Sequence, residues 1–242
     1  MSEVLNQVLN YTPYFRGQQA DLHRDSVMLE EAYRLRYQVY CLECRYLPEQ
    51  NYPDGRETDS YDEYSTHYCS FDRSGSMVGY VRLVEMDDRG RFPFQDHCVL
   101  FEGAKLPPPS ECGEVSRLMV RSDYRRRRGD TLAGVNETQS IEAAPPQEDR
   151  RSNTPQLLLS LYRQMYAHSR KNGINYWYAA MEVPLARSLA RMNFGFQQVG
   201  AQTDYYGPVA PYLADLRELE RRLAETAPGL LAWMQAPDVL NA

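Results

Sequence analysis

The chain has 242 residues, of which 43% are hydrophobic and 25% are charged, a composition typical of a globular protein with a sizeable core. Its formal net charge of −6 argues against nucleic-acid binding by the whole surface, so any basic contact would have to be local. No apolar run approaches the ~20 residues that span a bilayer, and the N-terminal residues lack the build of a signal peptide. Five cysteines, an odd number, favour reduced thiols and a cytoplasmic location over a disulfide framework.

The first part of the chain predicts one helix followed by three strands. Apolar residues recur near helical spacing up to Pro48, which ends the pattern, and shorter segments farther on alternate between apolar and polar residues. The expected elements are a helix over residues 25–47, an acid-rich loop over 49–64, and strands over 66–72, 77–86 and 113–120.

The second part predicts a β-α-β unit and a helical end. Residues 129–153 contain no aromatic side chain and are rich in acids, so we expect a mobile insertion there. The expected elements are a helix over 156–173, a strand over 174–181, a helix from Pro184, and a final helix over 211–225 within a C-terminal helical tail over 208–242. Together the elements predict one domain over residues 1–242 with an α/β or α+β fold, in which a largely antiparallel sheet leads into the β-α-β unit.

Charged residues occur where a core would normally be apolar. Glu57, Asp59 and Asp62 follow each other with the spacing ExDxxD, and so many acids on a short loop need water, cations or basic partners. The candidate partners are Arg36 in the first helix and Arg82 in the otherwise apolar strand VGYVRLV. An exposed sheet face is the alternative explanation for Arg82.

The strand GEVSRLMV carries the candidate catalytic residues. Strict alternation places Glu114 and Ser116 on one face and Arg117 on the other. A glutamate near a cleft with neighbouring arginines suits general base catalysis, whereas a solvated strand end is the simpler alternative. The pattern Cys41-x-x-Cys44 has no second CxxC, so we expect buried thiols and no metal site.

Four consecutive arginines, Arg125, Arg126, Arg127 and Arg128, follow that strand. Such a run is most often simply solvated. It lies between the end of a strand and the next helix, which is a common position for phosphate binding. Nucleic-acid binding usually brings dispersed basic residues, whereas this chain is acidic overall. The run could therefore bind a phosphate or an acidic partner.

The motifs together resemble a known family. The family is that of the acyl-homoserine-lactone synthases and the related N-acyl amino acid synthases, whose motifs are similar, in the same order, to RYQVYCLE, PDGRETDSYD, VGYVRLV and GEVSRLMV followed by an arginine cluster. The chain most resembles the PEP-CTERM/exosortase system-associated acyltransferases. The residues that match characteristic positions of the family are Arg36, Tyr40, Asp59, Asp62, Arg82, Glu114 and Arg117, while Tyr46 stands where lactone synthases usually have tryptophan.

The resemblance implies a GNAT-type fold, with helices around a mixed central sheet whose two central parallel strands splay apart to admit the pantetheine arm of a thioester donor. These strands would be residues 113–120 and 174–181. It also implies roles for the matched residues. Arg36, Asp59, Asp62 and Arg82 would shape the acceptor site. Glu114 would help to remove the ammonium proton, with Ser116 beside it, and backbone N–H groups near residues 118–120 would stabilise the oxyanion.

The arginine run lacks the glycine-rich loop with which acetyl-CoA enzymes of this class bind a diphosphate. We therefore expect a donor with a single phosphate, the acyl-4'-phosphopantetheine of an acyl carrier protein, and no permanently bound cofactor. The resulting hypothesis is a cytoplasmic N-acyltransferase that acylates the α-amine of an amino acid, with peripheral membrane contact only through its lipid product. The alternatives are homoserine-lactone synthesis from S-adenosylmethionine and a non-catalytic module that binds a lipid or a carrier protein.

Overall fold

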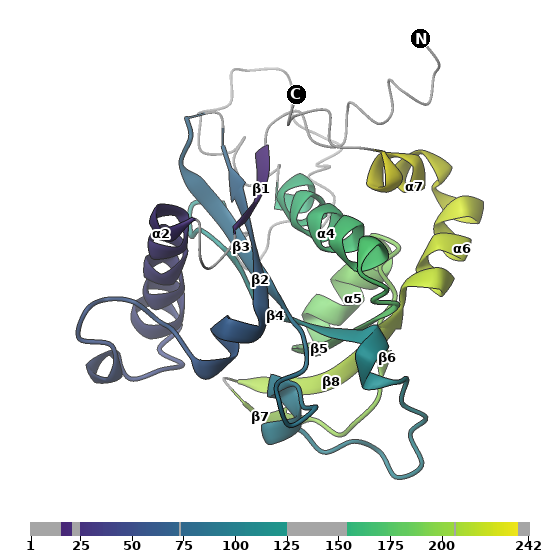
Figure 1. The fold of residues 1–242 in the computed structure, drawn as a ribbon, viewed down its shortest axis with the longest axis horizontal. Helices are drawn as coiled ribbons and strands as arrows, with labels where there is room; N and C mark the ends of the chain where they lie inside the picture. The colour runs from purple at the N-terminus through teal and green to yellow at the C-terminus, as the bar shows by residue number, and fades with distance from the viewer. Residues whose placement is uncertain (1–15, 21–24, 73, 125–153, 206, 237–242) are drawn as a thin grey trace, which may run out of the picture.

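The computed structural model describes residues 16–20, 25–72, 74–124, 154–205 and 207–236 (Figure 1). The proposed insertion over 129–153 and the arginine run over 125–128 lie outside the described residues. Within the described part of the chain, no helix is both long and apolar enough to cross a membrane.

One mixed sheet forms the centre of the fold, with the order β1-β2-β3-β4-β5-β8-β6 and β7 paired to β8. Every pairing is antiparallel except that of β4 with β5, which are joined through a helix. This arrangement confirms the predicted mixed sheet with a β-α-β unit. The strands are β1 (Arg16–Ala20), β2 (Ser65–Phe71), β3 (Met77–Val84), β4 (Cys112–Val120), β5 (Tyr176–Met181), β6 (Gln197–Gln198), β7 (Thr203–Asp204) and β8 (Pro208–Asp215).

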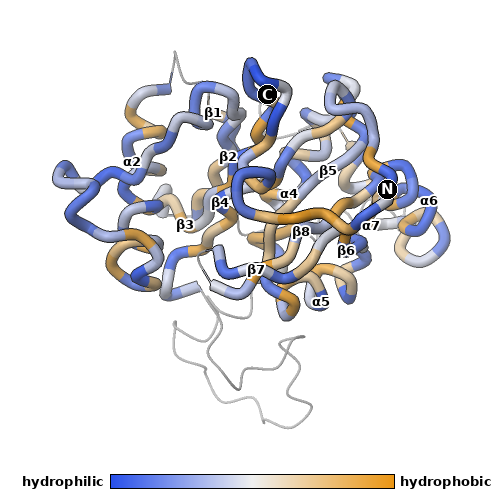
Figure 2. The backbone as a smooth tube through the Cα atoms, turned by 90° about the horizontal axis from the view of Figure 1, so that it is seen from below, coloured by the Kyte–Doolittle hydropathy of each residue, from blue (hydrophilic) through white to orange (hydrophobic). Residues whose placement is uncertain are grey.

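Helices cover both faces of the sheet (Figure 1). The helices are α2 (Ser26–Tyr37), continued by the π-helical turn η1 (Gln38–Glu43), α4 (Thr154–Lys171), α5 (Val183–Arg191), α6 (Leu216–Thr226) and α7 (Pro228–Gln235). On one face, Ala32 and Leu35 of α2 pack against Tyr80 and Met119. On the other face, α4, α5, α6 and α7 enclose the main core around Trp177. Hydrophobic residues accordingly concentrate in the strands and hydrophilic residues in the outer turns (Figure 2).

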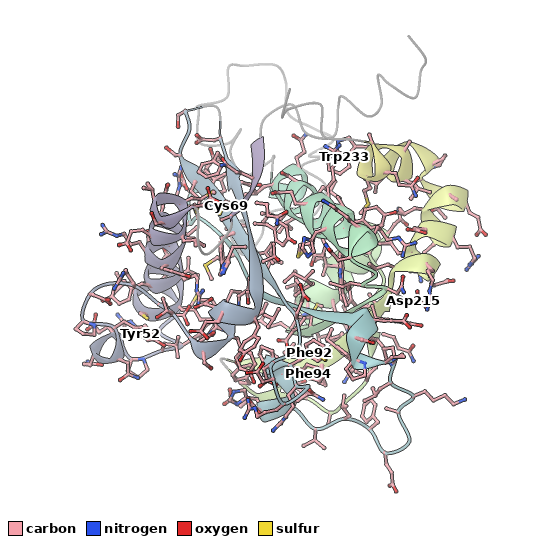
Figure 3. All side chains as sticks on the ribbon, in the orientation of Figure 1. Tyr52, Cys69, Phe92, Phe94, Asp215 and Trp233 are labelled. Carbon is pink, nitrogen blue, oxygen red and sulfur yellow. The ribbon has the colours of Figure 1, made fainter. Side chains whose placement is uncertain are left out.

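The predicted final helix over 211–225 is wrong at its start. Residues 208–215 form β8, and α6 begins only at Leu216, where the Asp215 carboxylate accepts a hydrogen bond from the Arg217 backbone N–H at 2.9 Å (Figure 3). Leu213 continues the helical spacing of the leucines in α6, but it pairs with Tyr178 in the sheet. Without β8, β5 would be a sheet edge, and its pairing outweighs the local helical pattern. Within the described part of the proposed tail, the helices are therefore Leu216–Thr226 and Pro228–Gln235.

The prediction that side chains alternate strictly along β4 is also wrong, at one position. Arg82 lies opposite Ser116 and Tyr80 lies opposite Met119, so Val81 faces two residues of β4. This β-bulge includes Arg117, whose φ of 55° is unusual for a residue with a side chain. The extra residue turns the Arg117 side chain to the face that carries Glu114 and Ser116.

The central parallel strands separate halfway along their length. β4 pairs with β5 only from Cys112 to Glu114, against Tyr176 to Tyr178, although both strands continue beyond this point. The bulge at Arg117 lies just past the last paired residue. The predicted splaying of strands 113–120 and 174–181 is therefore confirmed.

Candidate active site

A cavity of about 680 Å³ occupies the gap between the splayed strands. On the α2 side its lining is polar and aromatic and includes Glu114, Arg117 and Tyr40. On the side of α4 and α5 it is apolar, with Leu158 and Leu185 among its walls. The cavity therefore has a polar chamber and an apolar chamber, which meet at the split in the sheet. Such a cavity can hold an aliphatic chain in the apolar chamber and an amine in the polar chamber, next to the carbonyl end of the chain.

Six ionic side chains, here called the charged cluster, lie beside the polar chamber, and all of them are buried except Asp59, which is partly exposed. They alternate in sign, so that each guanidinium contacts more than one carboxylate. The six residues are Arg36, Glu57, Asp59, Asp62, Arg82 and Arg117.

Arg36 and Arg82 anchor the charged cluster from α2 and β3, and both side chains are fully buried. Arg36 donates from Nε to Glu57 Oε2 and from Nη1 to Asp62 Oδ1, each at 2.5 Å. Arg82 donates to Asp62 Oδ1 at 2.6 Å and to both carboxylate oxygens of Asp59 at 2.7 and 2.8 Å. The predicted pairing of these arginines with the ExDxxD acids is thus present, and an exposed position for Arg82 is excluded.

Arg117 joins the charged cluster to the cavity. Its Nη2 donates to Glu57 Oε1 at 3.0 Å and to Asp59 Oδ2 at 2.9 Å. Its guanidinium also lies 5.0 Å from the centre of the Tyr40 ring, a cation–π contact. Asp59, with 25% of its side chain exposed, is the member of the charged cluster that is most open to solvent.

The acidic motif is held by its own backbone. The Asp59 carboxylate accepts from the Tyr61 N–H at 2.9 Å, and the Asp62 carboxylate accepts from the Asp59 N–H at 2.8 Å, at the start of the short helix η3 (Ser60–Tyr64). These reciprocal hydrogen bonds form a capping box. The ExDxxD spacing therefore fixes the local turn and aims its carboxylates at the arginines.

The ion pairs set the response of the fold to acid. Burial by itself raises the pKa of Glu57, but attraction to Arg117 and Arg36 outweighs burial and lowers the pKa to about 2. The pKa of Asp59 is also below its ordinary value, because Arg82 and Arg117 outweigh the effect of burial. Depressed carboxylate pKa values stabilise the fold above the unfolded-state values of about 4, and this stabilisation is lost as the pH falls through the folded-state values.

We therefore expect the free energy of unfolding to decline between about pH 5 and pH 2, as measured by urea titration at a series of pH values. The decline should be shallower in a Glu57→Gln variant, which has lost one of the groups that must be protonated. If the free energy of unfolding of the wild type were constant over this pH range, it would contradict the conclusion that these ion pairs stabilise the fold.

Glu114 is the buried acid of the polar chamber, with 3% of its surface exposed. It accepts a hydrogen bond from the Phe94 backbone N–H at 2.8 Å, and the Phe94 ring packs 4.7 Å from that of Tyr178. Phe92 and Phe94 lie together beside the sheet (Figure 3). Burial in these surroundings raises the pKa of Glu114 to about 8, against the opposing effects of the Phe94 hydrogen bond and of Arg82. A carboxyl that titrates near neutral pH in a cavity is suited to proton transfer.

The remaining predicted residues also line the cavity. Ser116 follows Glu114 on the same face, Tyr40 lies within η1, and Tyr46 lies shortly beyond its end. The two tyrosine rings meet edge to face at 5.8 Å, and Tyr46 is 38% exposed. The predicted residues from Arg36 to Arg117 are therefore brought together around one cavity and its charged cluster. Those from Arg125 to Arg128 are not described.

Sequence reasoning missed several parts of the site. Glu57 was recognised only as the first acid of its motif, yet it bridges Arg36 and Arg117. The Phe94 amide that holds Glu114 and the apolar wall from α4 and α5 have no recognisable motif. Among the described residues, no group of three histidines, cysteines or acids could hold a metal ion.

Comparison with known proteins finds similarity to acetyltransferases and to acyl-homoserine-lactone synthases. Residues 35–134 match the GNAT acetyltransferase domain. The matched segment contains β2, β3 and β4 together with all six residues of the charged cluster. The chain is also 24% identical over 170 residues, 70% of each chain, to an acyl-homoserine-lactone synthase of Aeromonas salmonicida.

Solved structures share the fold of the chain. The acyl-homoserine-lactone synthase LasI aligns with a TM-score of 0.56 and 18% identity, over 82% of this chain and 88% of LasI. The CoA-dependent acyl-homoserine-lactone synthase BjaI, with SAM and isopentyl-CoA, aligns with a TM-score of 0.57 and 19% identity, over 91% of this chain and 98% of BjaI. The predictions of a GNAT-like fold, an acyltransferase and a relation to lactone synthases are confirmed. The association with PEP-CTERM/exosortase systems stays a prediction.

Proposed function

We propose that the protein transfers a fatty acyl group from an acyl carrier protein to the α-amine of an amino acid, giving an N-acyl amino acid. The observation that carries this proposal is the position of Glu114. Its buried carboxyl, with a pKa near 8, lines the polar end of a cavity that continues through the split sheet into an apolar chamber. An amine acceptor and an aliphatic thioester can meet at this point.

In the proposed reaction, the Glu114 carboxylate takes a proton from the acceptor ammonium, and the neutral amine attacks the thioester carbonyl carbon. A C–N bond forms and the carbonyl becomes a tetrahedral oxyanion. The C–S bond then breaks, and the thiolate leaves with the second proton of the attacking nitrogen. The products are the amide and the free thiol of the donor, and Glu114 releases its proton to solvent.

Backbone amides of β4 are suitable oxyanion donors. The Arg121 N–H donates to the Val78 carbonyl at 2.9 Å, on the side of β3. Because amides alternate in direction along a strand, those of Val120 and Leu118 point to the opposite edge, which pairs with no described strand beyond Glu114. Both residues line the cavity. We assign the oxyanion to these two N–H groups, and preorganised donors of this kind are typically worth about 10²–10³ in kcat each.

The charged cluster would shape the acceptor side without supplying a net charge, since three arginines are matched by three acids. Arg117, on the bulge, is the guanidinium of the charged cluster that lines the cavity. We therefore place the acceptor between Arg117, Glu114 and Tyr46. In this arrangement the acceptor carboxylate faces Arg117 and its amine faces Glu114.

The donor is proposed to be a carrier protein on the basis of the arginine run and the absence of a glycine-rich diphosphate loop in the sequence. Purified protein should turn over acyl-carrier protein with a kcat/KM at least tenfold above that for the matching acyl-CoA. Equal efficiency with the two donors would contradict the carrier-protein assignment and leave the acyl transfer itself intact.

Homoserine-lactone synthesis is the second candidate, because the curated relative and the similar structures are lactone synthases. The two candidates differ in product mass. We expect mass spectrometry of reactions containing acyl-carrier protein, the twenty amino acids and S-adenosylmethionine to find an N-acyl amino acid, and this product should be absent with a Glu114→Gln variant. An acyl-homoserine lactone as the main product would overturn our choice.

A further inference from the structure

The lining of the cavity includes one charged group that the proposed reaction does not use. Its charged residues are Glu114, Arg117 and Glu182. Glu114 accepts a hydrogen bond from a backbone amide, and Arg117 is paired within the charged cluster. Glu182, by contrast, forms no hydrogen bond or ion pair through its side chain with any residue that the structure describes.

Glu182 lies where β5 ends and α5 begins. It is the N-cap residue of α5, but its side chain does not accept a hydrogen bond from that helix, as N-cap side chains often do. Its backbone is extended, so the alternation along β5 places it on the face of Tyr178 and Ala180 and not on that of Met181, which packs in the main core. The Glu182 carboxylate therefore lies on the side of the sheet that carries Glu114.

The Tyr46 hydroxyl and the Glu182 carboxylate converge on one point beside Gly207. A side-chain carbon on Gly207 would lie 3.8 Å from the Tyr46 hydroxyl oxygen and 4.0 Å from Glu182 Oε1. Gly207 has a φ of 102°, which favours glycine, so this space stays open. Burial raises the pKa of Tyr46, and the negative charge of Glu182 adds to this effect, in agreement with their proximity.

The unpaired carboxylate suits an acceptor with a second positive charge. The charged cluster contributes no net charge, and the proposed acceptor position directs the α-carboxylate to Arg117 and the α-amine to Glu114. A neutral amino acid in this position leaves Glu182 without a counter-ion. An ammonium or guanidinium group on the acceptor side chain can donate both to Glu182 and to the Tyr46 hydroxyl.

The separation of the two glutamates favours a long side chain. Tyr178 pairs with Glu114 across the parallel strands, and Glu182 lies four positions after Tyr178. Four residues of an extended strand span about 13 Å. An arginine or lysine side chain extends about 6 Å from its α-carbon, and a hydrogen bond of about 2.9 Å at each end nearly completes this span. Shorter diamino acids do not reach both carboxyl groups.

We propose that Glu182 binds the cationic side chain of the acceptor, so that the enzyme acylates the α-amine of arginine or lysine in preference to neutral amino acids. This inference rests on the proposed function, which positions the amine and carboxylate of the acceptor. It adds the chemical class of the acceptor, and it makes Glu182 the residue that determines this specificity.

The test compares arginine with citrulline, which has the same length but no charge, as acceptors for one acyl-carrier protein. The wild type should use arginine with a kcat/KM about three- to tenfold above that for citrulline, the effect of about one hydrogen bond, and mainly through a lower KM. In Glu182→Gln this ratio should fall to about one, through slower reaction with arginine. Glu182→Lys should use the acidic amino acid 2-aminoadipate better than arginine.

Asp204→Asn is the matched control. Asp204 is an exposed acid next to Tyr205, which lines the cavity, but Asp204 itself lies outside the cavity lining. The substitution removes the same charge as Glu182→Gln and should keep the wild-type ratio. A ratio lowered equally by both substitutions would overturn the inference, since the preference would then come from the overall charge of the surface.

Binding of free arginine and citrulline, measured by calorimetry, separates this inference from the proposed function. If no amino acid is acylated, the proposed function fails, but a three- to tenfold binding preference for arginine that Glu182→Gln removes would still support the role of Glu182. Equal turnover of the two acceptors by the wild type, or equal binding where neither is acylated, would overturn the inference. An equal loss of rate with both acceptors in Glu182→Gln would also overturn it, since Glu182 would then serve the fold or the chemistry.

Discussion

Replacement of Glu114 by glutamine is expected to lower kcat/KM by about 10²–10⁴-fold, the usual contribution of a general base. Glutamine has the shape of the protonated acid and its side-chain oxygen can still accept from the Phe94 N–H, so the cavity should be preserved. The change therefore removes proton transfer and leaves the packing intact. Initial rates with acyl-carrier protein and a saturating amino acid would measure the loss.

The pH dependence of the wild type gives a second measurement of the same prediction. Burial raises the pKa of Glu114 to about 8, so the base form accumulates, and kcat/KM should rise, as the pH passes through this value. The glutamine variant should lose this limb of the profile. Stability should show the opposite trend. Between about pH 4 and pH 8 the native carboxyl keeps a proton that the unfolded chain releases, so this group lowers the free energy of unfolding as the pH rises, and Glu114→Gln removes that slope.

Ser116→Ala is the matched control, because Ser116 lies on the same face of β4 and lines the same cavity. If Ser116 only lines the strand, the rate should fall by no more than about threefold, far less than the loss of a general base. A Glu114→Gln enzyme with wild-type kcat/KM would show that Glu114 is not the base. A loss in Ser116→Ala as large as that in Glu114→Gln would assign the serine a direct role.

Replacement of Glu57 by alanine should lower the free energy of unfolding by about 3–5 kcal/mol, the usual effect of removing one partner from a buried ion pair. Glu57 is fully buried and accepts from both Arg36 and Arg117. Without it, both guanidiniums lose a buried partner, and Arg117 loses one of the contacts that hold it on the bulge. Urea denaturation followed by circular dichroism would measure the change.

Glu63→Ala is the control for this prediction, since Glu63 is an exposed acid on the same acid-rich segment. Its removal should change the free energy of unfolding by less than about 0.5 kcal/mol. Equal stabilities of the Glu57→Ala and Glu63→Ala variants would mean that the charged cluster contributes nothing to stability. A stable Glu57→Ala protein that had lost activity would instead indicate that the charged cluster serves only the acceptor site.

Local sequence patterns predicted the order of the main elements and most residues of the candidate site. The α2 helix, the hairpin of β2 and β3, β4 and the unit of α4 and β5 all follow from local periodicity, because helices and strands repeat their apolar residues at different short intervals. The acidic motif and the arginines could be recognised as candidate site residues in the sequence, because charged residues are rare in apolar segments unless they have a partner. Glu114 could be recognised as a candidate for the same reason.

The directions of those side chains and their surroundings follow from the tertiary structure. The bulge at Arg117 depends on the register between β3 and β4, which a strand pattern does not encode, and it reverses the face of that side chain. Residues 208–215 form a strand because β5 has an edge with which they can pair, although Leu213 continues the helical spacing of the leucines in α6. The Phe94 amide on Glu114, the second partner of Glu57 and the apolar chamber around Tyr162 join segments far apart in the chain. Such contacts are set by packing across the whole fold, which local periodicity cannot report.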